Sequence, residues 1–473
     1  MGGWLRRKSF DALERTDAAH RLKKTLSWPH LVALGVGAIV GTGIYTLIGQ
    51  GAGLAGPAVI LSFVIAGAVC VCAALCYAEM ATTIPASGSA YTYSYTVIGE
   101  TVAWVVGWSL ILEYTVVCAA VASGWAGHVL EFLPGLNIPA SLLTDTSTAL
   151  HDHAGPAINL PGVFIALAVA GVLLIGARES ATLTIVLVAV KLAALAAFVA
   201  IALPHFSTAH LHPFAPNGVS RTTPDGTKIG IMAAASIIFF AFYGFDAVST
   251  AAEETKNPGR DLTIGILGSM GLCTVIYIVV GLAAVGALPV AAFAAAKAPL
   301  VFIMDSLHQP LVAKLVAGAA VLALPTVILA FMYGQSRIFF VMARDGLLPR
   351  ALSKVNAKTG TPVAMTLLTG VIAAAIAGVL PLGQIVALAN AGTLCAFIAV
   401  AVCVILMRVR EKGRPRVFST PLWWLTAPLA VLGCLYLFTT LPTTTIVWFF
   451  VWNGIGLLLY VLFARRSSLL AKG

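Results

Sequence analysis

The sequence GAIVGTGIY, residues 37–45, interrupts an apolar run that is long enough to span a membrane. Glycine inside a helix costs about 1 kcal/mol relative to alanine, and this stretch holds three glycines in nine residues. A later apolar run carries FAFYGFDAV, residues 240–248, with Gly244 and Asp246 near its middle. A carboxylate at mid-span is costly in lipid unless it is paired or hydrated. Both stretches therefore predict a local break in a membrane helix.

The composition of the whole chain also indicates a membrane protein. Its 473 residues are 60% hydrophobic and only 10% charged, and the mean hydropathy is +0.98. Soluble globular proteins have about 25% charged residues, so these charges are too few to cover a soluble surface. An ordinary cytosolic enzyme, a disordered protein and a nucleic-acid binder are excluded. The sequence shows no nucleotide-binding loop, no nucleophile-and-base set and no metal cluster. We therefore expect no enzyme activity, no cofactor and no metal.

Twelve apolar stretches of membrane-spanning length follow one another along the chain. Each span needs about 20 apolar residues. The stretches are about 28–54, 57–84, 101–130, 161–177, 182–203, 230–254, 262–288, 309–342, 362–380, 383–407, 422–441 and 443–464. The sequence thus predicts an all-α polytopic membrane protein with twelve transmembrane helices and no soluble domain. All eight cysteines fall inside these stretches, so we expect packing residues and no disulfide framework.

The distribution of Lys and Arg predicts the orientation of the chain. With both termini in the cytoplasm, 23 of these residues fall inside and 4 fall outside. This asymmetry satisfies the positive-inside rule. The net charge of +10 then reflects topology and attraction to anionic lipid, and it does not indicate nucleic acid.

A broken helix supplies the chemistry to bind an amino acid. In lipid, unpaired N–H and C=O groups are tolerated only where they line a cavity. Free N–H groups attract a carboxylate and free carbonyls attract an ammonium, and an amino acid carries both. Spans one and six each begin a five-helix set, which is typical of an inverted-repeat transporter with a binding site near the midplane. For the first stretch alone, the alternative is that Gly37, Gly41 and Gly43 only permit close helix packing.

Ionisable residues inside the spans need a role, because each costs about 3 kcal/mol or more at the bilayer centre. The four are Glu79, Glu113, Lys191 and Asp246. Burial favours the neutral form of a lysine, so Lys191 is a candidate for losing and regaining a proton. We expect its ammonium to bridge carbonyls freed in the first span and to occupy a place that sodium would need. The alternative is a lysine that extends to the membrane interface.

The three acids have different expected roles. Glu113 is the candidate counter-charge or proton relay for Lys191, with a static ion pair as the alternative. Glu79 lies near the inner end of its span, where we expect it to hold a helix end or an inner gate. Asp246 is expected to cap the second half of the broken sixth helix, with direct substrate contact as the alternative. One of the five aromatic side chains in residues 239–245 is a candidate gate over the substrate.

Five segments together resemble the cationic amino acid transporter family of the amino acid–polyamine–organocation superfamily. The segments are residues 37–45, 75–95, 110–114 (LILEY), 240–262 and 343–349 (ARDGLLP). The resemblance implies a LeuT-type fold of five-plus-five inverted repeats with helices 1 and 6 broken. It divides the chain into a cytoplasmic arm (1–27), two repeats (28–203 and 204–407), and two additional helices with a cytoplasmic C-terminus (408–473). Tyr45 departs from the pattern, where Phe is usual.

The resemblance also implies proton-coupled, sodium-independent transport of L-amino acids across the bacterial inner membrane by alternating access. The partners would be an L-amino acid, protons and the lipid bilayer. The substrate carboxylate would meet amides at Thr42 and Gly43, and its ammonium would meet carbonyls of the two breaks. The substrate-binding residues that we expect are Ile39, Gly41, Thr42, Gly43, Phe240, Tyr243, Gly244 and Asp246, and the proton-coupling residues are Lys191 and Glu113.

The sequence leaves the substrate range and the mode of transport open. No additional acid is available to bind a cationic side chain beyond Asp246 and Glu113, which favours a neutral or broad substrate range. An amino acid exchanger without proton coupling is one alternative. A non-transporting receptor on the same scaffold is another. The sequence does not assign an oligomeric state.

Overall fold

The computed structural model describes residues 6–9, 24, 26–86, 88–133, 135, 138–153, 155–175, 181–224, 226–349 and 363–472. Most of the expected cytoplasmic arm, residues 1–27, therefore lies outside the described residues. Part of the basic set used to predict the orientation, including Arg178, also lies outside them.

The first apolar stretch forms three consecutive helices. They are α2 (Trp28–Ile39), α3 (Thr42–Tyr45) and α4 (Leu47–Ala55). Between α2 and α3, Gly41 has φ −147° and ψ −145°, far from helical values. This confirms the predicted break at residues 37–45.

The second to fifth apolar stretches also form helices, and two shorter helices lie between them. After a short 3₁₀ turn, η2 (Gly56–Ala58), the chain continues through α5 (Val59–Thr83), α6 (Ser89–Val97), α7 (Glu100–Phe132), α8 (Thr146–His151), α9 (Leu160–Ile175) and α10 (Ala181–Ala202). A small antiparallel hairpin follows, in which β1 (Arg221–Thr222) pairs with β2 (Lys228–Ile229).

The sixth apolar stretch is also broken, as predicted. It consists of α11 (Ile231–Ile238), the 3₁₀ turn η6 (Phe239–Ala241) and α12 (Phe245–Thr250). Gly244 separates the turn from α12 with φ 122°, a conformation that favours glycine because it has no Cβ.

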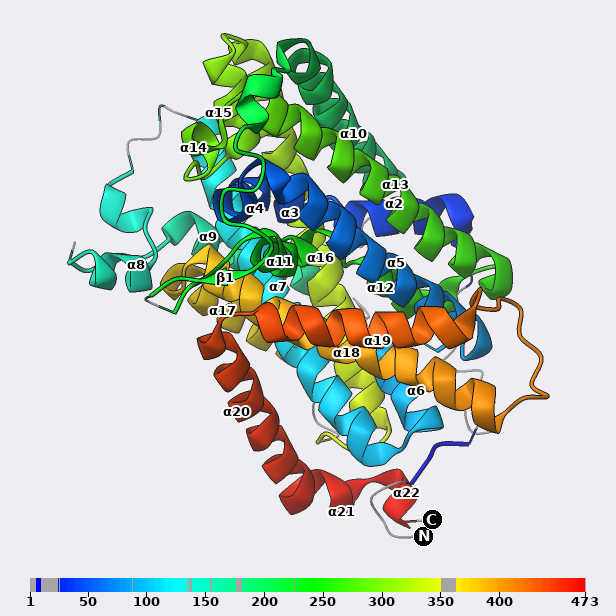
Figure 1. Cartoon of the computed structure of the whole chain (residues 1–473). Helices are drawn as coiled ribbons and strands as arrows, with labels where there is room; N and C mark the ends of the chain where they lie inside the picture. The colour runs from blue at the N-terminus through cyan, green and yellow to red at the C-terminus, as the bar shows by residue number, and fades with distance from the viewer. Residues whose placement is uncertain are drawn as a thin grey trace.

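The remaining chain is helical with short connections. It comprises α13 (Pro258–Ala287), α14 (Val290–Phe293), α15 (Pro299–Ser306), α16 (Pro310–Arg344), α17 (Val363–Val379), α18 (Leu382–Arg410), α19 (Trp423–Thr440), α20 (Thr443–Leu459), the π-helical η9 (Tyr460–Ala464), α21 (Arg465–Ser467) and α22 (Leu469–Lys472). Figure 1 shows α19 lying across the front of α18 and α5, while α20 extends away from the other helices.

Ten helical segments in the described part of the chain are long and apolar enough to cross a membrane. Two shorter apolar helices, α9 and α17, occupy the fourth and ninth predicted stretches. Large apolar side chains on α19 and α20 face outward, and Trp424 and Trp448 are more than 60% exposed. Exposed apolar side chains of this size indicate contact with lipid.

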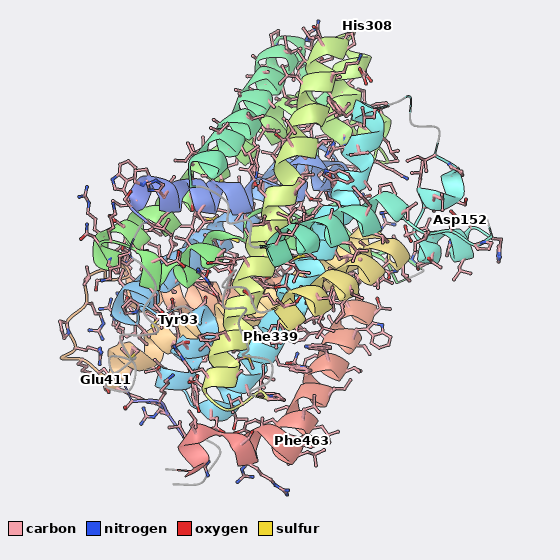
Figure 2. The ribbon with its side chains drawn as sticks, turned by 180° about the vertical axis from the view of Figure 1, so that it is seen from behind. Tyr93, Asp152, His308, Phe339, Glu411 and Phe463 are labelled. Atoms are coloured by element: carbon pink, nitrogen blue, oxygen red, sulfur yellow. The ribbon has the colours of Figure 1, made fainter. Side chains whose placement is uncertain are left out.

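The long helices α7 and α16 pack together and pass beside both breaks. Figure 2 shows α16 running from the end of the molecule marked by His308 toward the end marked by Phe463. At the latter end, residues near both termini contact Asp345. The Lys8 ammonium lies 2.7 Å from an Asp345 carboxylate oxygen, and the Leu469 amide donates to the Asp345 carbonyl at 3.2 Å.

Glu79 holds the connection between α18 and α19, as its expected role at a helix end implied. Its carboxylate accepts two hydrogen bonds from Arg408, at 2.9 and 2.8 Å, and lies 3.2 Å from Arg416. It also accepts the Thr420 amide at 2.8 Å. This buried acid therefore fixes a basic loop to the end of α5.

Candidate functional site

The two breaks pack directly against each other. A Cβ added at Gly43 would overlap the backbone of Ala241 in the sixth stretch. A Cβ added at Gly244 would lie 2.9 Å from the Ala38 carbonyl carbon and 3.0 Å from the Ile39 nitrogen. Only a hydrogen atom fits at either contact, so these two glycines permit the breaks to meet.

The first break leaves backbone donors without helical partners. The initial N–H groups of any helix have no intrahelical acceptor, and α3 begins at Thr42. In the described chain, the amides of Gly41, Thr42 and Gly43 donate in none of the hydrogen bonds that connect separate segments. The Thr42 hydroxyl is buried and also lacks a partner among the described residues.

Lys191 on α10 satisfies the carbonyl side of the same break. Its side chain is fully buried. The ammonium donates to the Gly37 carbonyl at 2.7 Å and to the Val40 carbonyl at 3.1 Å. The expected bridge to freed carbonyls is present, and the alternative of a lysine that extends to the interface does not fit this burial.

Another carbonyl at the break is already engaged. The Tyr277 hydroxyl of α13 donates to the Ile39 carbonyl at 2.7 Å. This is one of the first-break carbonyls that the family resemblance assigns to the substrate ammonium, and the hydrogen bond from Tyr277 occupies one of its two lone pairs. The carbonyls of Phe240 and Tyr243 accept none of the side-chain or inter-segment hydrogen bonds seen among the described residues.

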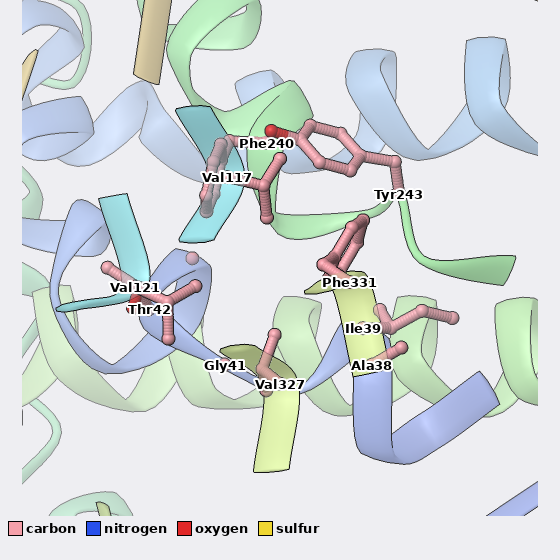
Figure 3. A pocket seen from close by; sticks show the side chains of 11 residues that line it. Ala38, Ile39, Gly41, Thr42, Val117, Val121, Phe240, Tyr243, Val327 and Phe331 are labelled. Carbon is pink, nitrogen blue, oxygen red and sulfur yellow. The ribbon is translucent and has the colours of Figure 1, made fainter. Parts of the chain in front are cut away.

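A small cavity lies where the breaks meet. Figure 3 shows its side chains arranged around one space, with the Tyr243 ring reaching across toward Phe240. Six of the expected substrate-binding residues line it: Ile39, Gly41, Thr42, Gly43, Phe240 and Tyr243. Its volume is about 10 Å³, which is room for about one water molecule. At this volume the cavity is closed to an amino acid, which binds only if the surrounding helices move.

The other walls of the cavity are apolar and come from α7 and α16. They include Val117 and Val121 on α7 and Val327 and Phe331 on α16. Sequence reasoning missed all four. Each pair is spaced i, i+4 and so shares one helix face, but the same spacing occurs throughout apolar helices and carries no distinguishing signal.

Two of the five aromatic side chains in residues 239–245 face the cavity. The rings of Phe240 and Tyr243 meet edge to face at 4.9 Å, and Tyr243 lies 6.4 Å from Phe331. The other three pack away from the cavity; for example, Phe242 contacts Tyr277 at 5.2 Å. Phe240 and Tyr243 are thus the candidates for the expected gate.

Two predicted substrate-binding residues lie behind the cavity wall. Gly244 and Asp246 are not among its lining residues. One Asp246 carboxylate oxygen accepts the Gly244 amide at 3.0 Å, and the other accepts the Tyr114 hydroxyl at 2.8 Å. Both Asp246 oxygens are therefore engaged, one by the amide just before α12 and one by a hydroxyl of α7, which is compatible with the expected role at the start of α12.

Glu113 and Lys191 are not brought together. Glu113 is fully buried on α7, and neither of its carboxylate oxygens has a hydrogen-bond partner among the described residues. It faces α18, where a Cβ added at Gly392 would lie 2.9 Å from the Glu113 Cβ. The expected counter-charge and its alternative, the static ion pair, are absent from this arrangement because the Lys191 ammonium binds α2 carbonyls instead.

Tyr45 uses the hydroxyl that distinguishes it from the expected Phe. This hydroxyl donates to the Lys191 carbonyl at 3.1 Å, which joins α3 to α10. The ring stands edge-on to His128 at 5.8 Å, and the His128 Nε2 lies 3.3 Å from the Thr46 hydroxyl. In the described chain, no group of three or more His, Cys, Asp or Glu side chains is placed to hold a metal ion.

The geometry thus provides amide donors, free carbonyls and an apolar wall around one small cavity.

This chain matches the family model described as "Amino acid permease" over residues 26–463. It is 40% identical to the branched-chain amino acid permease BcaP of Bacillus subtilis (strain 168), over 99% of both chains. It is 37% identical to a methylthioribose transporter of the same organism, over the full length of both. It is also 36% identical to the vacuolar cationic amino acid transporter 4 of Arabidopsis thaliana, over 88% of this chain and 69% of that protein.

Proposed function

Because this chain belongs to the amino acid permease family of the amino acid–polyamine–organocation superfamily, we propose that it is a secondary active transporter of L-amino acids. It moves them by alternating access and catalyses no reaction. The observation that carries the proposal is the meeting of two broken helices around a cavity lined by free peptide groups. Amides at Thr42 and Gly43 bind the substrate carboxylate, and carbonyls of Phe240 and Tyr243 bind its ammonium.

The side chain of the substrate is apolar in this proposal. Val117, Val121, Val327 and Phe331 form the wall that faces the free peptide groups. A cationic side chain placed there would lose its hydration without gaining an acidic partner. The similarity to a branched-chain amino acid permease supports leucine, isoleucine and valine as substrates.

Transport is coupled to protons and independent of sodium in this proposal. The Lys191 ammonium sits on two carbonyls at the end of α2. Loss of its proton removes the charge from these hydrogen bonds, which weakens them by about half and frees the first span to move. While protonated, the ammonium also fills the space beside these carbonyls, where a sodium ion would otherwise be coordinated.

The proposed topology places twelve helices in the bacterial inner membrane with both termini in the cytoplasm. At 1.5 Å per residue, the described parts of α9 and α17 reach about 24 Å, so each crosses most of a hydrocarbon core of about 30 Å. Residues 28–203 and 204–407 then form two inverted five-helix repeats. Residues 408–473 add two helices and the C-terminus. The matching position of the two breaks, first in each repeat, supports this division.

An amino acid exchanger without proton coupling is the second candidate. The burial of Lys191 and its two backbone hydrogen bonds also suit a purely structural lysine. Such a protein would exchange amino acids and would ignore a pH gradient.

Uptake into proteoliposomes tests the proposal. The purified protein is reconstituted, and radiolabelled L-leucine uptake is measured with and without an imposed pH gradient, acid outside. We expect accumulation with the gradient and competition by isoleucine and valine but not by lysine. Uptake that needs internal amino acid and ignores the gradient would favour the exchanger. Saturable binding without any uptake would indicate a receptor.

A further inference from the structure

The segment that carries α14 and α15 lies against the end of α7, at the end of the molecule away from α22 (Figure 1). A second cavity, which we call the outer cavity, is lined by residues of these elements. Its volume is about 380 Å³. Ligand pockets in proteins usually measure about 300–1,000 Å³. Unlike the closed central cavity, this one has room for an amino acid.

The outer cavity carries charges of both signs. Glu131 of α7 and Asp305 of α15 contribute carboxylates, and Lys297, between α14 and α15, contributes an ammonium. None of the three forms an ion pair with another residue of the described ranges. Among the described residues, the Lys297 ammonium donates a single long hydrogen bond, 3.3 Å, to the Leu143 carbonyl. The three charges are therefore available to a ligand.

This set complements the charged groups of an amino acid. Two carboxylates suit an α-ammonium, and the single ammonium suits an α-carboxylate. Leu130 and Phe302 add apolar surface to the same cavity, which suits an aliphatic side chain. Because the charged side chains are exposed to water, screening keeps such binding weak. A bound molecule can therefore return to solvent or move on to the central cavity.

The outer cavity and the central cavity share α7 as a wall. Gly127 lines the outer cavity, and the adjoining His128 contacts the Thr46 hydroxyl. Thr42, one helical turn before Thr46, lines the central cavity. The α14–α15 segment also covers α4, since a Cβ added at Gly49 would lie 2.7 Å from Pro299 Cγ. The contact between His128 and Thr46 thus connects α7 and the first span close to residues that line the two cavities.

We infer that the outer cavity is a capture site that binds the α-amino and α-carboxylate groups of an amino acid before the central cavity opens. The inference rests on the proposed function, because it takes an amino acid as the substrate. The captured molecule waits in the outer cavity and enters when the first span moves. Capture raises the rate of entry without changing the transport step itself.

Uptake kinetics test this role. In the double variant Glu131→Gln/Asp305→Asn, we expect kcat/KM for L-leucine to fall about tenfold, equivalent to 1.4 kcal/mol, while uptake at saturating leucine stays unchanged. Lys314→Gln, which neutralises an exposed lysine at the start of α16 outside this cavity, is the matched control and should leave both values unchanged. A purely structural role would lower the maximal rate or the yield of folded protein. An unchanged kcat/KM in the double variant would overturn the inference.

A binding measurement separates this site from the central one. Gly43→Leu disrupts the central site, because any Cβ at this position overlaps Ala241. Any L-leucine binding that remains in folded protein, detected by saturation-transfer NMR, therefore belongs to the outer cavity. We expect this binding to persist and to disappear when Glu131→Gln and Asp305→Asn are added. Isoamylamine should compete, whereas 4-methylpentanoate, which lacks the ammonium, should not. Loss of all binding in Gly43→Leu, with normal wild-type uptake, would refute the capture site alone. Persistent binding with no wild-type uptake would refute the proposed function alone.

Discussion

The Lys191 ammonium lies 2.7 Å from the Gly37 carbonyl oxygen, across the boundary between α10 and α2. This contact joins a continuous helix to the end of a broken one. The same ammonium reaches the Val40 carbonyl at 3.1 Å, so it spans the last turn of α2. The carbonyls at the first break are therefore held by an ionisable side chain, and this contact is the basis of the proposed coupling.

Gly43→Leu is expected to abolish L-leucine transport and to weaken binding at the central site about 100-fold or more. The reason is steric, because any Cβ at this position overlaps Ala241. Gly271→Leu is the matched control, since a Cβ there meets no atom within 4 Å. Both are measured by uptake into proteoliposomes, with thermal unfolding to verify folding. Normal leucine affinity at the central site in Gly43→Leu would place the substrate elsewhere.

Val121→Ala is expected to shift side-chain selectivity toward larger substrates. The substitution removes two methyl groups from the apolar wall of the central cavity, and such changes in a hydrophobic pocket alter discrimination by about 10-fold or more. The ratio of kcat/KM for phenylalanine over valine should rise accordingly. Val172→Ala, at a position 42% exposed on α9, should leave the ratio unchanged. An equal ratio in wild type and Val121→Ala would show that this wall does not contact the substrate.

Glu79→Gln is expected to destabilise the protein without changing the leucine KM. Glu79 is 2% exposed and its partners Arg408 and Arg416 are 15% and 10% exposed. Removing one partner of a buried ion pair costs about 3–5 kcal/mol, so the thermal unfolding temperature in detergent should fall. The exposed Glu411 on the same loop provides the control, Glu411→Gln. A changed KM with unaltered unfolding would instead make Glu79 part of the transport pathway.

Replacement of sodium by choline is expected to leave L-leucine uptake unchanged. The Lys191 ammonium binds the carbonyls of Gly37 and Val40, and a sodium ion bound there would meet its positive charge. The measurement compares initial uptake rates in the two salts at equal ionic strength and fixed pH. A rate that rises with sodium concentration would contradict the proposed coupling ion.

The sequence was sufficient to predict both breaks and the destination of Lys191. Glycines at residues 37, 41 and 43 weaken a helix, and an acid at 246 is costly inside lipid. Inside an apolar span, such residues therefore predict a break in the helix. Lys191 is also costly inside lipid, because a buried ammonium must find acceptors, and the freed carbonyls at the first break are such acceptors.

Other parts of the site could not be predicted from the sequence. Val117 and Phe331 resemble many apolar residues of α7 and α16, and only the rotation of each helix about its axis selects them for the cavity. The same rotation turns Glu113 toward Gly392 on α18 and away from Lys191. Gly244 was expected to bind substrate, but it is not among the lining residues and instead approaches Ala38 closely, which depends on how the two breaks cross.

In the proposed mechanism, the amine of Lys191 on α10 couples proton movement to the meeting of the two breaks. The most direct test of this coupling is leucine-driven proton entry into proteoliposomes that contain a trapped pH-sensitive dye, in wild type and in Lys191→Ala, with leucine counterflow measured in parallel. We expect external L-leucine to acidify the lumen of wild-type vesicles, and Lys191→Ala to abolish this acidification. Undiminished acidification by Lys191→Ala, or none by an actively transporting wild type, would contradict the claim.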